Sequence, residues 1–70
     1  MSVSYASLPA LVRETAEREL TRKQLDVFKL RYNGHSYVGI SLVMGVSEAT
    51  VRGHLRRAHQ KLKPCLETVA

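Results

Sequence analysis

The sequence is poor in cysteine and in large aromatic residues. Its 70 residues include one cysteine, no tryptophan and one phenylalanine. Because Cys65 is alone, it can form neither an internal disulfide nor a cysteine-based zinc site, which agrees with a reducing compartment. No apolar run approaches the roughly 20 residues that a membrane span requires, and the N-terminus lacks a basic-then-apolar signal sequence. We therefore expect a cytoplasmic protein without membrane contact.

Residues that carry catalysis or bind metals are also scarce. Asp26 is the single aspartate, no nucleophile lies at a suggestive spacing from it, and there is no glycine-rich phosphate loop. His54 and His59 are five residues apart, on different sides of a helix, and no acid or cysteine completes a ligand set. We expect no enzyme, no metal and no cofactor. His35, His54 and His59 are interpreted as turn, flank or phosphate-side residues.

The length allows one domain with a small core. A chain of this size hides only about 60% of the surface that its unfolded form exposes, so its helices must share one apolar centre. We expect a lead-in without regular structure over residues 1–7 and a domain over residues 8–63. Pro64 favours the end of the last helix. Residues 64–70 are then either a short tail or a last turn that packs Leu66 on the core.

A first helix is predicted from an N-cap at Ser7, with Pro9 in the first turn. Its apolar positions share one side, and they are Leu8, Leu11, Val12, Ala16 and Leu20. The opposite side is charged, which favours a solvated face over a binding surface.

A second helix has the stronger start signal. Thr21 with Gln24 forms a capping box, and Leu20 with Leu25 is the matching hydrophobic staple, so the helix should begin at Arg22. Its apolar positions are Leu25, Val27, Phe28, Leu30 and Tyr32. Asn33-Gly34 supplies the stop.

The third helix is predicted to be short and apolar. Ser36 is its expected N-cap, and Ile40 and Val43 are expected to face inward, with Leu42 as a third candidate. Gly39 costs about 1 kcal/mol relative to alanine in a helix interior. It either has a packing reason, such as the close approach of another backbone, or simply weakens this helix.

A tight turn follows and leads into a fourth helix. Gly45 can adopt the left-handed conformation that ends a helix, and Ser47 can cap the next helix. Val46 and Val51 can close as a hydrophobic staple that fixes the angle between the two helices. Helix, tight turn and longer helix form the pattern of a helix-turn-helix, whose second helix enters a DNA groove.

The fourth helix divides into a buried and a charged face. Val51, Leu55, Ala58 and Leu62 recur at helical spacing and predict the buried side. Residues 50–63 contain three arginines and two lysines and no acid, which matches the formal net charge of +5 for the whole chain. A basic helix of this kind is typical of a nucleic-acid contact. We expect an all-α domain of four helices, with the helix-turn-helix in a three-helix core.

Residues 20–64 resemble region 4 of bacterial sigma factors (sigma-70 or ECF type) and, more distantly, the DNA-binding domain of LuxR-type regulators. The resemblance is carried by the segments Leu20-Thr21, Leu30-Arg31-Tyr32, Ser36-Tyr37, Gly45-Val46-Ser47, Thr50-Val51, Arg57-Ala58 and Lys61-Leu62. The family commonly has Glu-Ile-Ala where this chain has Gly39-Ile40-Ser41, so contacts of that glutamate do not transfer. The other sigma regions have no counterpart here, so promoter melting by this chain alone is not expected.

The resemblance implies that the fourth helix, about residues 48–62, lies in the major groove. The residues expected to contact DNA are Ser47, Glu48, Ala49, Thr50, Arg52, Gly53, Arg56, Arg57, Lys61 and Lys63. Arg52 and Arg56 are the candidates for base reading, because a guanidinium can bond guanine O6 and N7 together. Glu48 either accepts from a cytosine amine or offsets the helix dipole. The small Ala49 and Gly53 either admit the groove floor or are tolerated on an exposed face.

The remaining candidates fit the DNA backbone. Thr50 has a hydroxyl that can bond a phosphate oxygen. Arg57, Lys61 and Lys63 are expected to contact phosphates, which gives affinity without sequence choice.

Two functions stay open from the sequence. The first is a sequence-specific regulator of transcription in bacteria or phage that binds double-stranded DNA, with a homodimer as one arrangement. The second is a protein-interaction module that docks on RNA polymerase or another regulator through its first two helices. The basic fourth helix favours the first.

Overall fold

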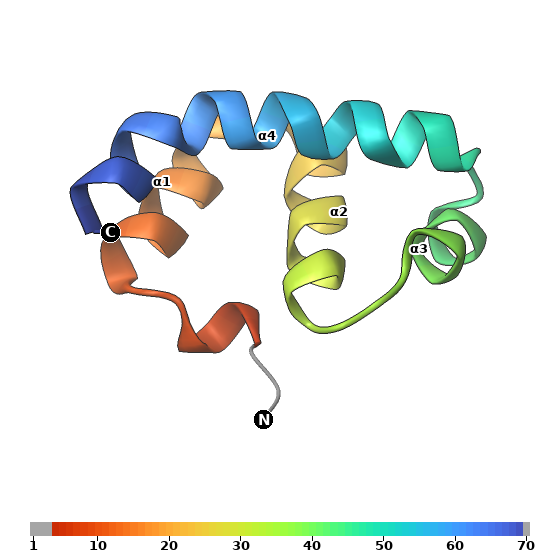
Figure 1. The fold of residues 1–70 in the computed structure, drawn as a ribbon, viewed down its shortest axis with the longest axis horizontal. Helices are drawn as coiled ribbons and strands as arrows, with labels where there is room; N and C mark the ends of the chain where they lie inside the picture. The colour runs from red at the N-terminus through yellow and green to blue at the C-terminus, as the bar shows by residue number, and fades with distance from the viewer. Residues whose placement is uncertain (1–3, 70) are drawn as a thin grey trace.

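The longest helix, α4 (Glu48–Val69), runs across the other three α-helices and joins them into one unit (Figure 1). The computed structural model describes residues 4–69. The elements in chain order are η1 (Tyr5–Ser7, a 3₁₀ helix), α1 (Ala10–Glu19), α2 (Arg22–Tyr32), α3 (Tyr37–Met44) and α4 (Glu48–Val69). The described residues contain no strand. The predicted all-α fold with four helices is confirmed. None of the described helices has the length and apolarity that a membrane crossing requires.

The core consists of two clusters, one on each side of α2. The α1-side cluster is formed by Val12, Ala16, Leu20, Phe28, Ala58, Leu62 and Cys65. The α3-side cluster is formed by Val27, Ile40, Val51 and Leu55. The adjacent residues Val27 and Phe28 belong to different clusters because successive side chains on a helix point about 100° apart. The predicted buried row of α4, from Val51 to Leu62, therefore spans both clusters.

The predicted start of α2 is confirmed. The Thr21 hydroxyl accepts from the Gln24 amide, and the Gln24 side-chain oxygen accepts from the Thr21 amide, both at 3.2 Å. Leu20 is buried and Leu25 packs against the same cluster, as the predicted staple requires. The helix ends at Tyr32, and Gly34 follows with a φ of 96°. The capping box and the glycine after the last turn therefore set the start and the end of α2.

The predicted N-cap at Ser7 is wrong. The Ser7 hydroxyl lies 3.1 Å from that of Ser4, and α1 begins only at Ala10, with Pro9 as its cap residue and no side-chain cap bond. The reason is steric, since a residue before proline is driven into extended conformation, and Leu8 has a ψ of 150°. In the predicted apolar stripe, Leu11 is the exception, because it is 47% exposed.

Residues 5–7 are ordered differently from the predicted lead-in. They form η1, and the Tyr5 ring meets the Phe28 ring edge-on at a centroid distance of 6.0 Å. The Tyr5 amide also donates to the Asn33 side-chain oxygen at 2.9 Å. These contacts join η1 to α2 and to the residue that follows it, which are distant in the sequence, so no local pattern predicts them. Residues 1–3 of the predicted lead-in lie outside the described residues.

Tyr5 predicts an alkaline loss of stability that Tyr5→Phe should remove. Burial raises the pKa of the Tyr5 phenol, the Glu17 carboxylate raises it further, and Arg13 opposes these effects. The fold therefore favours the protonated phenol, and this stabilisation is lost as pH rises through the folded pKa, above about pH 10. Melting temperatures at about pH 8 and about pH 11 should fall further for the wild type than for Tyr5→Phe. Equal falls would contradict this assignment.

The inward positions of α3 were predicted only in part. Ser36 caps the helix through a bond from the Gly39 amide at 3.0 Å, and Ile40 is fully buried, as expected. Val43 and Leu42 are 64% and 77% exposed, so their predicted inward positions are wrong. Ile40, Tyr37 and Met44 lie on the buried side of α3. Leu42 and Val43 therefore point outward. A Cβ at Gly39 would meet only the Ser36 hydroxyl, at 3.3 Å, so no second backbone approaches it.

Pro64 does not end the last helix, contrary to the prediction. α4 continues to Val69 with Pro64 inside it. Cys65 is only 9% exposed and Leu66 packs against the α1-side cluster, so apolar contact continues past the proline. An interior proline costs a helix about 3 kcal/mol, and this packing offsets the cost. Of the two alternatives for the C-terminal residues, packing of Leu66 on the core is the one observed, and residue 70 lies outside the described residues.

Candidate nucleic-acid interface

The turn between α3 and α4 has the predicted geometry. Gly45 is left-handed, with a φ of 69°, and its amide donates to the Ser41 carbonyl. The Ser47 hydroxyl accepts from the Thr50 amide at 3.2 Å and caps α4. Val46 packs against the α3-side cluster that contains Val51, as the predicted staple requires. The two helices are therefore held as a helix-turn-helix.

The exposed surface of α4 has one crest and two flanks. Successive residues turn by about 100°, so Ala49, Gly53 and Gln60 lie opposite the buried row and form the crest. The Arg52 flank, on the α3 side, consists of Arg52, Arg56 and Lys63. The Arg57 flank, on the other side, consists of Thr50, Arg57 and Lys61. Small side chains at the start of the crest thus stand between two basic flanks.

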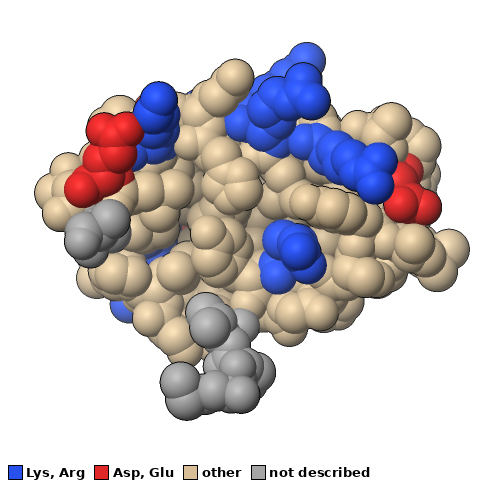
Figure 2. Space-filling view, in the orientation of Figure 1, with Lys and Arg blue, Asp and Glu red and all other residues tan. Residues whose placement is uncertain are grey.

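Positive charge gathers over α4. Figure 2 shows lysine and arginine side chains along the upper edge of the molecule, where α4 lies, with acidic groups only toward the two ends of that edge. Arg56, Arg57 and Lys63 are exposed and make no ion pair with another described residue. Their charges are therefore available to an anionic partner.

Arg52 has two neighbours that restrict it. Its guanidinium carbon lies 5.2 Å from the centre of the Tyr37 ring, and a guanidinium nitrogen lies 3.9 Å from a carboxylate oxygen of Glu48. The side chain is still 59% exposed, so a surface ion pair of this length contributes little to stability. Both predicted roles of Glu48 stay predictions, and its ion pair with Arg52 is a further contact within the protein.

Lys61 is engaged within the protein. Its ammonium group donates to the Gln24 side-chain oxygen at 2.9 Å and to the Glu19 carbonyl at 3.4 Å. These bonds connect α4 to the junction of α1 and α2. A phosphate contact by Lys61 would have to compete with them, so Lys63 is the better candidate of the two lysines.

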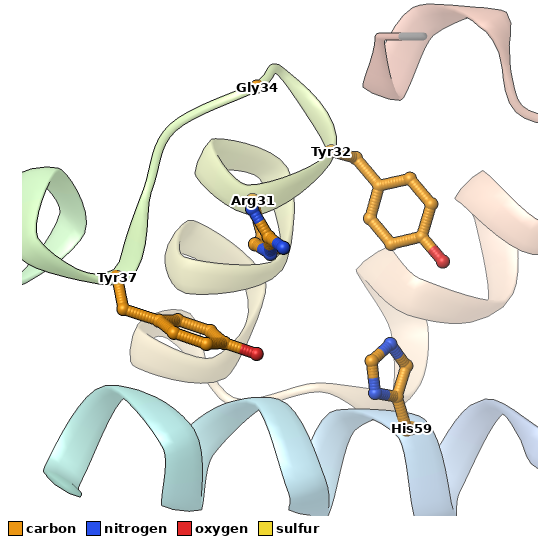
Figure 3. Close-up of a pocket in the computed structure, with 5 residues that line it drawn as sticks. All are labelled: Arg31, Tyr32, Gly34, Tyr37 and His59. Carbon is orange, nitrogen blue, oxygen red and sulfur yellow. The ribbon is translucent and has the colours of Figure 1, made fainter. Parts of the chain in front are cut away.

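Sequence reasoning missed a hollow beside the Arg52 flank. It is lined by Arg31, Tyr32, Gly34, Tyr37 and His59, and Figure 3 shows Arg31 and Tyr37 close together, with Tyr32 and His59 across from Tyr37. The Arg31 guanidinium carbon lies 4.9 Å from the Tyr37 ring centre, and Arg31 also donates to the His35 carbonyl at 3.1 Å. These residues come from three separate segments, and no motif in the sequence joins them.

The three histidines have different neighbours. His35 contacts the Leu30 carbonyl at 3.1 Å, and the His59 ring meets Phe28 edge-on at 6.0 Å. The Nδ1 atom of His54 is buried and has no hydrogen-bond partner among the described residues. Within residues 4–69, no three histidine, cysteine, aspartate or glutamate side chains are grouped to hold a metal ion.

A compact helical unit with a capped turn and a basic second helix defines a helix-turn-helix domain. The sequence model of the family "Sigma-70, region 4" matches residues 14–62. The chain therefore belongs to the sigma-70 region 4 family, whose members are non-enzymatic domains that act in transcription through DNA or RNA polymerase. The match covers the helix-turn-helix and excludes η1, the start of α1 and the last turns of α4. No curated protein and no solved structure matches the chain.

Proposed function

We propose that this protein is a sequence-specific regulator of transcription that places α4 in the major groove of double-stranded DNA. The observation that carries the proposal is the crest of α4, where Ala49 and Gly53 stand between two basic flanks. A crest of small side chains lets the helix approach the base edges, and basic flanks reach the two phosphate backbones.

The start of α4 supports the same orientation. The first turn of a helix presents free amides and the positive end of its dipole, which favour phosphate. Thr50 is exposed, and its hydroxyl lies 3.0 Å from that of Ser47, so the pair presents two polar groups at this end. Arg52 and Arg56 follow at one and two turns and are the proposed base readers. Arg57 and Lys63 are the proposed phosphate contacts.

Arg52→Ala and Lys63→Ala should weaken DNA binding in different ways. A bidentate arginine contact to guanine contributes about 1–3 kcal/mol of discrimination, so Arg52→Ala should lose base preference at one position. Lys63→Ala should weaken binding to all duplexes alike and reduce the slope of log K against log salt concentration by about 0.9. Selection from random duplex DNA supplies the preferred site. Equilibrium titrations at two salt concentrations then measure both effects.

The two variants serve as controls for each other, because each removes one exposed positive charge from the same flank of α4. If both caused the same small loss on every duplex, base reading by Arg52 would be refuted. The selected sequences also show whether the protein binds as a homodimer. Two copies of one half-site would support binding as a homodimer, since a single module often needs a partner for affinity.

A second candidate is docking on RNA polymerase or another regulator, and α3 favours it. Val38, Leu42 and Val43 are 53%, 77% and 64% exposed on a helix that carries no charged residue. Docking was predicted through the first two helices, but this apolar face makes α3 the better candidate. Co-purification with polymerase that survives charge reversal at Arg52 and Arg56, and is lost in Leu42→Lys, would favour this function over DNA reading.

A further inference from the structure

Tyr37 is the one aromatic residue that lies beside two arginines in the described chain. The guanidinium carbons of Arg31 and Arg52 lie 4.9 Å and 5.2 Å from its ring centre. A guanidinium within about 6 Å of an aromatic ring is attracted by the electrons of the ring face. Arg31 comes from α2 and Arg52 from α4, so the ring connects both helices to the start of α3.

The position of the Tyr37 ring is itself fixed. Tyr37 is the first residue of α3, directly after the Ser36 cap. It is partly buried and packs against the α3-side cluster. Arg31 is held as well, since it also donates to the His35 carbonyl. The ring is therefore a firm support for an arginine that is otherwise exposed.

We propose that Tyr37 is a specificity-determining residue that positions Arg52 for base reading. This inference rests on the proposed function, in which Arg52 reads a base edge. An arginine on this flank without such support can turn to a nearby phosphate instead of a base. A phosphate contact carries no sequence preference. The Tyr37 ring favours one direction of the Arg52 side chain, and the positive charge of Arg31 opposes a turn toward α2. Tyr37 therefore acts through Arg52 and need not touch DNA.

This role predicts a loss of selectivity that is larger than the loss of affinity. Without the ring, Arg52 keeps its charge and can still bind a phosphate, so binding to DNA in general continues. The arginine–ring contact contributes about 0.5–1 kcal/mol at an exposed site, which corresponds to about 2- to 5-fold in an equilibrium constant. The selectivity ratio for the base pair that Arg52 reads should fall by about this factor in Tyr37→Leu.

The experiment compares dissociation constants on the selected site and on duplexes that each differ from it at one base pair. The base pair that Arg52 reads is the one whose substitution weakens wild-type binding but leaves Arg52→Ala unaffected. Four proteins are titrated: the wild type, Tyr37→Leu, Tyr37→Phe and Arg52→Ala. Tyr37→Phe is the matched control, because it keeps the ring and removes only the hydroxyl. We expect a reduced ratio for Tyr37→Leu, an unchanged ratio for Tyr37→Phe and no remaining preference for Arg52→Ala.

The outcomes separate this inference from the proposed function. If Arg52→Ala loses its preference but Tyr37→Leu keeps the wild-type ratio, the positioning role is wrong and DNA reading stands. If Arg52→Ala itself keeps the preference, base reading by Arg52 fails, and the positioning role fails with it. Should Tyr37→Leu lose helix content by circular dichroism, Tyr37→Met takes its place.

In the free protein, the NMR signals of the Arg52 side chain should carry a ring-current shift in the wild type and in Tyr37→Phe. The absence of that shift from the wild type would also overturn the inference.

Discussion

Leu62→Ala should destabilise the domain by about 2–5 kcal/mol, whereas the same substitution at Leu42 should have almost no effect. Leu62 is fully buried in the α1-side cluster, where α4 meets α1 and α2. Its truncation removes apolar contacts and leaves a cavity that the neighbouring helices fill only in part. Domains of this size have a total stability of about 4–10 kcal/mol, so the loss is a large share of it.

Thermal unfolding followed by circular dichroism measures this difference. Each 1 kcal/mol shifts the melting temperature of so small a domain by about 4–8 °C, so Leu62→Ala should melt at least 8 °C below the wild type. Leu42→Ala is the matched control, because the side chain is identical and 77% exposed. Equal losses in the two variants would show that Leu42 is buried in solution, by self-association or by a different position of α3.

The starts of α2, α3 and α4 were predictable because their signals are local. Thr21 with Gln24, Ser36 with Gly39, and Ser47 with Thr50 each lie three residues apart, and each pair forms the expected cap bond. The left-handed glycine of the turn likewise acts on its own helix end. The buried row of α4 follows from helical spacing over several turns, so the period of the pattern also fixed which side is buried.

The error at Pro64 arose because distant contacts override local preference. Pro64 is a helix breaker by local rules, yet Cys65 and Leu66 gain burial against residues of α1 and α2, which the local rules do not include. Val43 fails for another reason. α3 has eight residues and is apolar almost throughout, so helical spacing alone does not determine which of its sides faces inward.

In the candidate site, too, features within one helix were predicted and contacts between helices were not. The charge and the spacing of the arginines on α4 were legible in the sequence, because both belong to one helix. The bond from Lys61 to Gln24 and the contact of Arg52 with Tyr37 join residues that are 37 and 15 positions apart, without a periodic pattern. Such contacts decide which charged groups are free and which are restrained, so the sequence identified the basic surface better than the role of each residue.

Substitution of Gly53 should raise the stability of the domain and weaken its binding to DNA. A Cβ built on Gly53 meets no atom within 4 Å, so a side chain is accommodated in the free protein. Glycine in a helix interior costs about 0.5–1 kcal/mol relative to alanine, so Gly53→Ala should raise stability by about that amount. The glycine therefore weakens α4 without a packing reason inside the domain, which is understandable if a partner approaches it closely.

DNA binding should fall as the side chain at position 53 grows. Gly53→Leu places an isobutyl group between α4 and the groove floor, which moves Arg52 and Arg56 away from the bases together. Since each of those two contacts contributes about 1–3 kcal/mol, affinity for the selected site should fall by about 30-fold or more. Gln60→Leu is the control, because Gln60 lies on the same crest about two turns beyond Gly53, farther from the start of α4, and this variant should bind nearly normally. If Gly53→Leu melts no lower than the wild type and still binds the selected duplex with wild-type affinity, the crest of α4 does not face the bases.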